Sequence, residues 1–167
     1  MSRLHILRYP DARLHKIAAP VEEINEIIRT LVADMAETMY AAPGVGLAAT
    51  QVDVHKQVIV VDASETRDKL LTLINPEIVT ASGVADCEEG CLSVPGIYEK
   101  IARAGRIGVR ALGLDGQRFT IQAEDMLAVC IQHEMDHLKG RVFVEYLSRL
   151  KQTRIRAKLQ KQQRQSA

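Results

Sequence analysis

The chain has 167 residues, 47% of them hydrophobic, and a formal net charge of +1. A chain of this length and apolar content can bury the core of one domain. The N-terminus lacks the apolar region of a signal peptide, and no apolar run reaches membrane-spanning length. These features exclude an integral membrane protein and predict a cytoplasmic one. With three cysteines, the chain is not expected to depend on disulfides.

A long amphipathic helix is predicted between Val21 and Tyr40, directly after Pro20. Apolar residues recur there at helical spacing, which predicts one stripe buried in the core. The stripe consists of Val21, Ile24, Ile27, Ile28, Leu31, Val32, Met35 and Met39. Its methionines are interpreted as core residues and not as a cofactor site.

Residues 44–51 read GVGLAATQ, a glycine turn that leads into a strand of small residues. The segment lacks the third glycine of a dinucleotide-binding loop and the Lys-Ser/Thr pair of a phosphate-binding loop. One interpretation is a tight structural turn. The functional interpretation is a bare backbone against an extended peptide, with the amide of Gln51 donating to a developing oxyanion.

Strands are predicted for the middle of the chain. Residues 58–61 and 70–74 are apolar runs typical of buried strands. Residues 106–112 and 118–122 predict a hairpin that turns at Asp115-Gly116. Since helices are predicted near both ends, the pattern favours an α+β fold with antiparallel sheet over repeated βαβ units.

Residues 89–96 read EGCLSVPG and place the thiol of Cys91 between a glycine and a short extended segment. The backbone can approach a ligand closely there, and Leu92 N–H can point into a site. A disulfide between Cys87 and Cys91 is the structural alternative, which an odd number of cysteines disfavours.

Residues 133–137 read HEMDH, an H-E-x-x-H pattern inside a predicted helix that ends near Gly140. Residues four apart project from one helix face, so His133 and His137 can bind one metal ion, with Glu134 beside it as a proton acceptor. The neighbouring apolar residues predict a mostly buried helix. Two histidines and a glutamate are costly there unless something pairs them. The chemistry suits hydrolysis of a carbonyl compound by metal-bound water.

A third ligand is needed to complete such a site. Metzincins extend the motif to a third histidine, but Phe143 occupies that position. Cys130 lies seven residues from His137, which is roughly 10 Å along a helix and too far to share one ion. It is therefore interpreted as a small hydrophobe. Cys87 and Cys91 remain, and Cys91 has the better surroundings. A Cys/His/His set with an open fourth position is typical of a catalytic site.

The C-terminal residues 149–167 hold seven Lys or Arg and no acidic residue. Lys151, Arg154, Lys158 and Lys161 recur at helical spacing and form one basic stripe, with Ser148 as the expected N-cap. A solvated terminal helix explains this pattern, and so does an anchor on an anionic surface with salt-dependent affinity.

Three of these segments together resemble the peptide deformylases, whose motifs have the form G-x-G-L-A-A-x-Q, E-G-C-L-S and H-E-x-D-H. The sequence carries them at residues 44–51, 89–93 and 133–137, in the family's order and with similar spacing. The resemblance covers essentially the whole chain and is closest in kind to the Gram-negative form. It implies antiparallel β-sheets packed around a central helix that bears H-E-x-x-H, an N-terminal amphipathic helix and a C-terminal basic helix.

The resemblance also implies roles for single residues. The metal ligands would be Cys91, His133 and His137. Glu134 would act as general base and then as acid. Gln51 and the Leu92 amide would hold the oxyanion, while Gly46 would lie against the substrate backbone. The residues that line the pocket for the methionine side chain of the substrate would be Val45, Glu89, Met126, Val129 and Cys130.

The reaction implied is removal of the N-formyl group from the N-terminal methionine of nascent polypeptides, with release of formate. The resemblance implies Fe²⁺ as the metal in the cell, with Zn²⁺, Ni²⁺ or Co²⁺ as substitutes. Residues 1–148 would form the catalytic domain, and residues 149–167 a basic extension that binds the ribosome. The alternatives are a metallopeptidase that cleaves peptide bonds and a nonenzymatic nucleic-acid-binding module with a structural metal.

Overall fold

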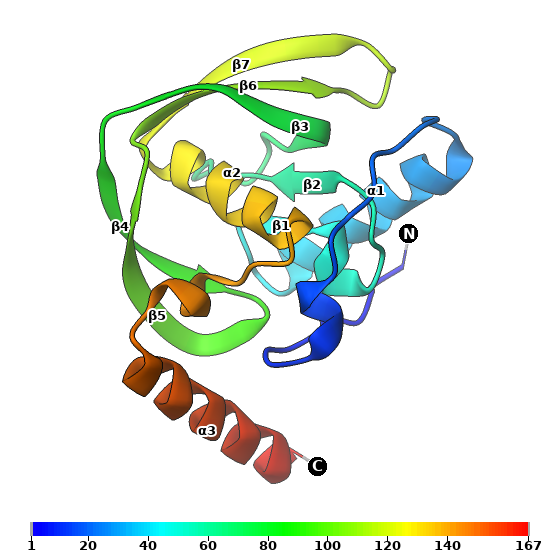
Figure 1. Ribbon diagram of the computed structural model, residues 1–167. Helices are drawn as coiled ribbons and strands as arrows, with labels where there is room; N and C mark the ends of the chain where they lie inside the picture. Colours follow the sequence, from blue (N-terminus) through cyan, green and yellow to red (C-terminus); the bar gives the residue numbers. More distant parts are fainter. Residues whose placement is uncertain (1, 167) are drawn as a thin grey trace.

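The structure is a computed structural model that describes residues 2–166. Residue 1 of the predicted catalytic domain and residue 167 of the predicted basic extension lie outside the described residues. The structure is an α+β fold with antiparallel sheets around a helix, as predicted (Figure 1). The elements are η1 (Ala12–His15), α1 (Glu26–Ala41), β1 (Gly46–Ala48), η2 (Ala49–Val52), β2 (Val58–Val61), β3 (Leu71–Ser82), β4 (Ala85–Cys91), β5 (Val94–Arg103), β6 (Arg106–Leu112), β7 (Arg118–Glu124), α2 (Asp125–Leu138), η3 (Phe143–Tyr146) and α3 (Arg149–Ser166).

Two antiparallel sheets make up the strand content. Five strands pair in the order β1-β2-β3-β6-β7, and β4 pairs with β5 in a separate hairpin. The predicted strand 58–61 and the predicted hairpin are confirmed, with Leu112 opposite Arg118 at the turn. The strand β3 continues to Ser82, well beyond the predicted end, because its second half pairs with β6.

The helices α1 and α2 pack on opposite faces of the five-stranded sheet, as the alternation of side chains along β2 shows. Val58 and Val60 contact the cluster that contains the buried residues of α1, including Met35. Ile59 and Val61 belong to the cluster with the buried residues of α2. A strand covered on both faces is expected to read as a continuous apolar run, as β2 does.

The prediction that the first helix begins at Val21 is wrong, since α1 begins at Glu26. Asn25 is its N-cap, and the Asn25 side chain accepts a hydrogen bond from Ile28 N–H at 3.2 Å. Val21 lies instead in an extended segment, where both its backbone N–H and its carbonyl bond to the Asn75 side chain. Val21 is buried although it is not helical, so its place in the spacing of the apolar stripe is a coincidence.

The helix α3 lies along the outside of β5 (Figure 1). Its buried residues Ile155 and Leu159 pack in a cluster with Ile97 and Ile101 of β5. Ser148 acts as its cap, with its hydroxyl accepting from Lys151 N–H at 3.2 Å, as predicted. Among residues 2–166, no helix combines the length and apolarity needed to cross a bilayer.

Candidate metal centre and substrate cleft

One thiol and two imidazoles meet between the β4–β5 hairpin and α2. Cys91 ends β4, and α2 presents His133 and His137 one turn apart. Their ligand atoms all lie within 4.8 Å of one another, and Cys91 Sγ is 3.4 Å from His137 Nε2. Within residues 2–166 these are the only three His, Cys, Asp or Glu side chains that meet in this way. All three cysteines lack a disulfide partner, which removes the Cys87–Cys91 alternative.

The electrostatics of this site suit a cation. Although burial alone lowers the pKa of His133, the neighbouring Glu134 and Cys91 raise it well above its usual value. Groups that favour positive charge on an imidazole also favour a bound metal ion. Burial lowers the pKa of His137, which keeps that ring neutral, as a metal ligand must be. The soft sulfur and imidazole donors fit a transition metal ion.

A chain of hydrogen bonds fixes the orientation of His133. Glu89 Oε1 accepts from His133 Nδ1 at 2.8 Å, which leaves Nε2 for the site. Arg103 binds the same carboxylate through Nε at 2.7 Å and Nη2 at 3.0 Å. Its Nη1 reaches Asp136 at 2.6 Å, and Tyr146 donates to that carboxylate at 2.9 Å. A carboxylate that holds the outer nitrogen of a ligand histidine is typical of metal centres.

The charged groups in this series of hydrogen bonds are paired with one another. Burial opposes ionisation of Glu89, but the hydrogen bonds from His133 and Arg103 lower its pKa below the usual value. Sequence reasoning missed the roles of Arg103, Asp136 and Tyr146. Asp136 lies inside the H-E-x-D-H motif, so the motif itself offered a clue. Arg103 comes from β5 and is distant in sequence, so no local pattern identifies it.

Glu134 lies at the floor of the site next to Gly46. Its side chain is buried, and Oε1 has no hydrogen-bond partner within the described part of the chain. Burial raises the pKa of Glu134 to about 7. A Cβ placed on Gly46 would come within 2.5 Å of Glu134 Oε2, so a larger residue there would displace the Glu134 side chain. The loop and the carboxylate are therefore in direct contact.

The Gln51 amide is held in one orientation. Its oxygen accepts from Ala48 N–H at 2.9 Å, so its NH₂ group must face the other way. Nε2 lies 3.0 Å from Ser93 Oγ and 3.6 Å from Cys91 Sγ. A donor is thus directed at the edge of the proposed metal site. Gly44 lies against the Leu92 side chain, with the position of a Cβ only 2.6 Å from Leu92 Cδ1.

A cavity of about 790 Å³ opens beside these groups. The N-terminal segment, the loop 42–46 and the start of β5 form its walls. Six of the predicted site residues line it: Val45, Gly46, Gln51, Cys91, Leu92 and Glu134. The other six lie outside this lining: the two histidines His133 and His137, Glu89, whose carboxylate is bound to His133 and Arg103, the half-exposed Met126, and the buried Val129 and Cys130.

Cys130 behaves as the small hydrophobe that was predicted. It packs in the cluster between α2 and the five-stranded sheet. Burial, reinforced by the negative charge of Glu134, raises its pKa to about 12, which keeps the thiol protonated.

Comparison with protein families places the chain in a known family. The model of the polypeptide deformylase family matches residues 3–153, which is most of the chain. The chain belongs to the polypeptide deformylase family. Family membership makes it an enzyme of the peptide deformylase class and favours this reading over the metallopeptidase alternative.

Individual deformylases match over nearly the full length. Peptide deformylase 2 of Nitrosomonas europaea is 66% identical over 98% of this chain and 89% of its own length. The enzyme of Neisseria gonorrhoeae is 57% identical over 98% of both chains. A deformylase crystal structure from Legionella pneumophila superposes with a TM-score of 0.95 at 46% identity, covering 99% of this chain and 98% of the other.

A second crystal structure, the Ehrlichia chaffeensis deformylase in complex with actinonin, gives a TM-score of 0.95 at 43% identity over 98% of this chain and 99% of that one. Deformylases are metalloenzymes that act on formylated nascent peptides, so the Cys/His/His cluster is where a metal is expected in this deformylase.

Proposed function

We propose that Cys91, His133 and His137 bind one divalent metal ion and that Glu134 carries the protons when the N-formyl group of a nascent polypeptide is hydrolysed. The observation that carries this proposal is the meeting of one Sγ and two imidazoles within 4.8 Å, beside a buried carboxylate with an unpartnered oxygen. An ion bound there would polarise the formyl carbonyl and lower the pKa of a water molecule.

The residues of the chain would then divide the remaining work. Glu134 takes the proton of the attacking water and passes it to the leaving amine, which frees the N-terminus and releases formate. Gln51 Nε2 and Leu92 N–H donate to the oxyanion that develops on the formyl oxygen. Glu89 and Arg103 hold His133 in its ligand orientation.

Substrate binding is proposed along the cavity. Val45 and Gly46 line its wall and would contact the first residues of the peptide. By resemblance to the family, Glu89, Met126, Val129 and Cys130 complete the surroundings of the methionine side chain. Val129 and Cys130 are consecutive buried residues of α2, on the turn before His133.

The metal in the cell is proposed to be Fe²⁺, with Zn²⁺, Ni²⁺ or Co²⁺ able to replace it. An imidazole and thiolate donor set accepts all four ions. The test is purification without oxygen, metal analysis, and formate release from formyl-Met-Ala-Ser beside the unformylated peptide. One iron per chain with release of formate supports the proposal. Cleavage of the unformylated peptide, or turnover without bound metal, contradicts it.

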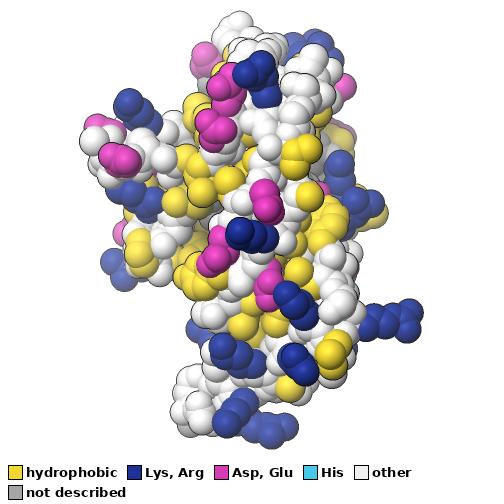
Figure 2. All heavy atoms as spheres, turned by 90° about the vertical axis from the view of Figure 1, so that its left-hand side faces the viewer, with side chains coloured by type: hydrophobic (Ala, Val, Ile, Leu, Met, Phe, Trp, Pro, Cys, Tyr) yellow, Lys and Arg dark blue, Asp and Glu magenta, His cyan; other side chains and the backbone are white. Residues whose placement is uncertain are grey.

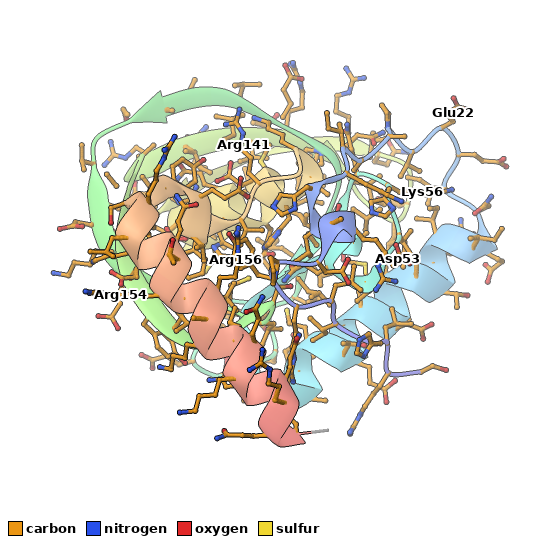
Figure 3. All side chains as sticks on the ribbon, turned by 60° about the horizontal axis from the view of Figure 1, so that its bottom comes forward. Glu22, Asp53, Lys56, Arg141, Arg154 and Arg156 are labelled. Carbon is orange, nitrogen blue, oxygen red and sulfur yellow. The ribbon has the colours of Figure 1, made fainter. Side chains whose placement is uncertain are left out.

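The helix α3 is proposed to bind the ribosome surface. Lys and Arg side chains gather over α3 at the lower end of the molecule, whereas charges of both signs alternate above it (Figure 2). Arg154 points away from the body, while Arg156 points inward, where Nη2 lies 3.3 Å from Tyr9 Oη (Figure 3). The outward stripe of Arg154, Lys158 and Lys161 is exposed and attracts a polyanion such as ribosomal RNA.

A test of ribosome binding must leave the packing of α3 intact, because Ile155 and Leu159 are buried. The triple variant Arg154→Gln, Lys158→Gln, Lys161→Gln is expected to co-sediment with ribosomes more weakly while hydrolysis of a short formyl-peptide is unchanged. The matched control neutralises three exposed charges elsewhere, Lys16, Lys56 and Arg118. Equal losses in both variants would contradict a specific role of α3.

The division into residues 1–148 as the catalytic domain and 149–167 as a basic extension is retained as a proposal. Docking of α3 on β5 supports an extension that stays attached to the domain. A cytoplasmic location is proposed as well, since the bacterial deformylases that match the chain act on nascent peptides.

A further inference from the structure

The loop 42–46 connects α1 to β1 and forms one wall of the substrate cavity. Its contacts with the site are very close. Gly44 packs on the Leu92 side chain, and Gly46 packs on the Glu134 carboxylate; a Cβ at these positions would lie 2.6 Å from Leu92 Cδ1 and 2.5 Å from Glu134 Oε2. A displacement of a few tenths of an ångström would therefore change the shape of the cavity where the peptide backbone is proposed to lie.

Arg67 binds this loop through its guanidinium group. Arg67 Nη2 donates to the Gly44 carbonyl oxygen at 2.5 Å. Its guanidinium lies over the Tyr40 ring, 5.0 Å from the centroid, so it is held between the end of α1 and the loop. A charged donor to a backbone carbonyl is among the stronger hydrogen bonds in proteins. Arg67 itself does not line the cavity.

The backbone around Arg67 is arranged to hold that side chain in place. Arg67 has φ of +60°, a left-handed conformation that a residue with a long side chain rarely adopts. Its N–H donates to Ser64 Oγ at 3.1 Å, and the Ser64 hydroxyl donates to Asp62. Asp62 is fully buried and also accepts from Tyr40 at 2.6 Å and from Lys69 N–H at 3.1 Å.

Asp62, which is bonded to Tyr40 and Ser64, also holds the next residue of the loop. Asp62 N–H donates to the Val45 carbonyl oxygen at 2.8 Å. Burial opposes the charge on Asp62, but the hydrogen bonds from Ser64 and Tyr40 lower its pKa to about 2, so the anchor is ionised at neutral pH. Two consecutive carbonyls of the cavity wall thus depend on the segment 62–69.

We propose that Arg67 is a positioning residue for peptide binding: by holding the Gly44 carbonyl, it sets the place of loop 42–46 against the substrate backbone. This inference rests on the proposed deformylase site and assigns no contact between Arg67 and substrate. Because the loop would contact the peptide in the ground state and in the transition state alike, loss of Arg67 weakens binding more than turnover.

The test compares Arg67→Met, Arg67→Lys and the control Arg106→Met, which removes an exposed arginine of β6. Steady-state kinetics with formyl-Met-Ala-Ser and amide hydrogen exchange are measured on the same metal-loaded preparations. Arg67→Met is expected to raise KM about tenfold, near the lower limit for the loss of one charged hydrogen bond, with kcat within about twofold. Exchange at Gly44 and Gly46 should accelerate, while that of α2 stays unchanged.

Arg67→Lys keeps the charge and one donor and should recover part of the KM, and Arg106→Met should match the unsubstituted protein. An unchanged KM in Arg67→Met overturns the proposal. A fall in kcat with faster exchange throughout the chain also overturns it, because that result indicates general destabilisation. If the unsubstituted protein releases no formate, the proposed function fails instead, and the exchange data still test the loop.

Discussion

Replacing Arg103 by methionine is expected to destabilise the protein and to weaken its metal site together. The guanidinium is buried, with its side chain 6% exposed, and it is the shared partner of two carboxylates, Glu89 and Asp136. Methionine has a similar length but no charge, so the substitution leaves the buried Glu89 and the partly buried Asp136 without their cation. Glu89 would keep only its bond to His133, which then loses a fixed position.

The magnitude follows from the cost of an unpaired buried charge. Removing one partner of a buried ion pair costs about 3–5 kcal/mol. In a domain of this size, each kcal/mol of lost stability lowers the midpoint temperature of thermal unfolding by about 2–4 °C. The midpoint of Arg103→Met should therefore fall by about 6–20 °C. Loss of the group that holds the outer nitrogen of a ligand histidine weakens metal affinity about 10- to 100-fold. Since Glu89 keeps its bond to His133, the loss of affinity in Arg103→Met should not exceed this range.

The assay is thermal unfolding at fixed, saturating Zn²⁺, beside competition with a chelator for metal affinity. Fixed metal is needed because bound ligand itself stabilises the folded state. The control is Arg106→Met, which breaks an exposed pair with Glu124 whose side chains are 64% and 58% exposed, and it should cost less than about 1 kcal/mol. If Arg103→Met costs no more than this control and binds metal normally, the proposed support of His133 is refuted.

Three further outcomes are expected. Glu134→Ala should keep its metal but lose nearly all formate release, and an active, metal-loaded variant would exclude Glu134 as the base. Gln51→Ala should lower kcat about 10²- to 10³-fold, as for other oxyanion donors; a change in KM alone would point to substrate binding instead. Asp62 should contribute up to about 2 kcal/mol of stability at neutral pH, because its pKa falls from 3.8 to about 2 on folding. That stability is present above about pH 4 and is lost as pH falls toward 2, so acid unfolding of Asp62→Asn, followed by circular dichroism, should depend less on pH in this range.

Much of the site could be predicted because its residues lie in short, ordered motifs. The i,i+4 spacing in α2 brings His133 and His137 together without any tertiary knowledge. The glycine beside Cys91 distinguished it from Cys87 as the predicted ligand. In the structure Cys91 meets the two histidines, whereas Cys87 lies opposite Ile101 in the hairpin. The orientation of the Gln51 amide was not predictable, since it depends on the Ala48 N–H at the start of η2.

The parts that sequence reasoning missed depend on distant partners. Arg103 and Arg67 are single arginines in segments without a motif. Arg103 binds Asp136, 33 residues away in the chain, and Arg67 binds Gly44, 23 residues away. The start of α1 was misplaced because Val21 and Ile24 continue the helical spacing, while Asn25 ends up as the cap. The extension of β3 was missed because its exposed half carries no apolar pattern and is ordered by pairing with β6.

The central claim is that one sulfur and two imidazoles hold a single divalent ion. Metal content per chain, measured after anaerobic purification of the unsubstituted protein, Cys91→Ser and Cys87→Ser, tests it most directly. The account predicts one ion per chain in the unsubstituted protein and in Cys87→Ser, and a loss of stoichiometric metal in Cys91→Ser. A full complement of tightly bound metal in Cys91→Ser would contradict it.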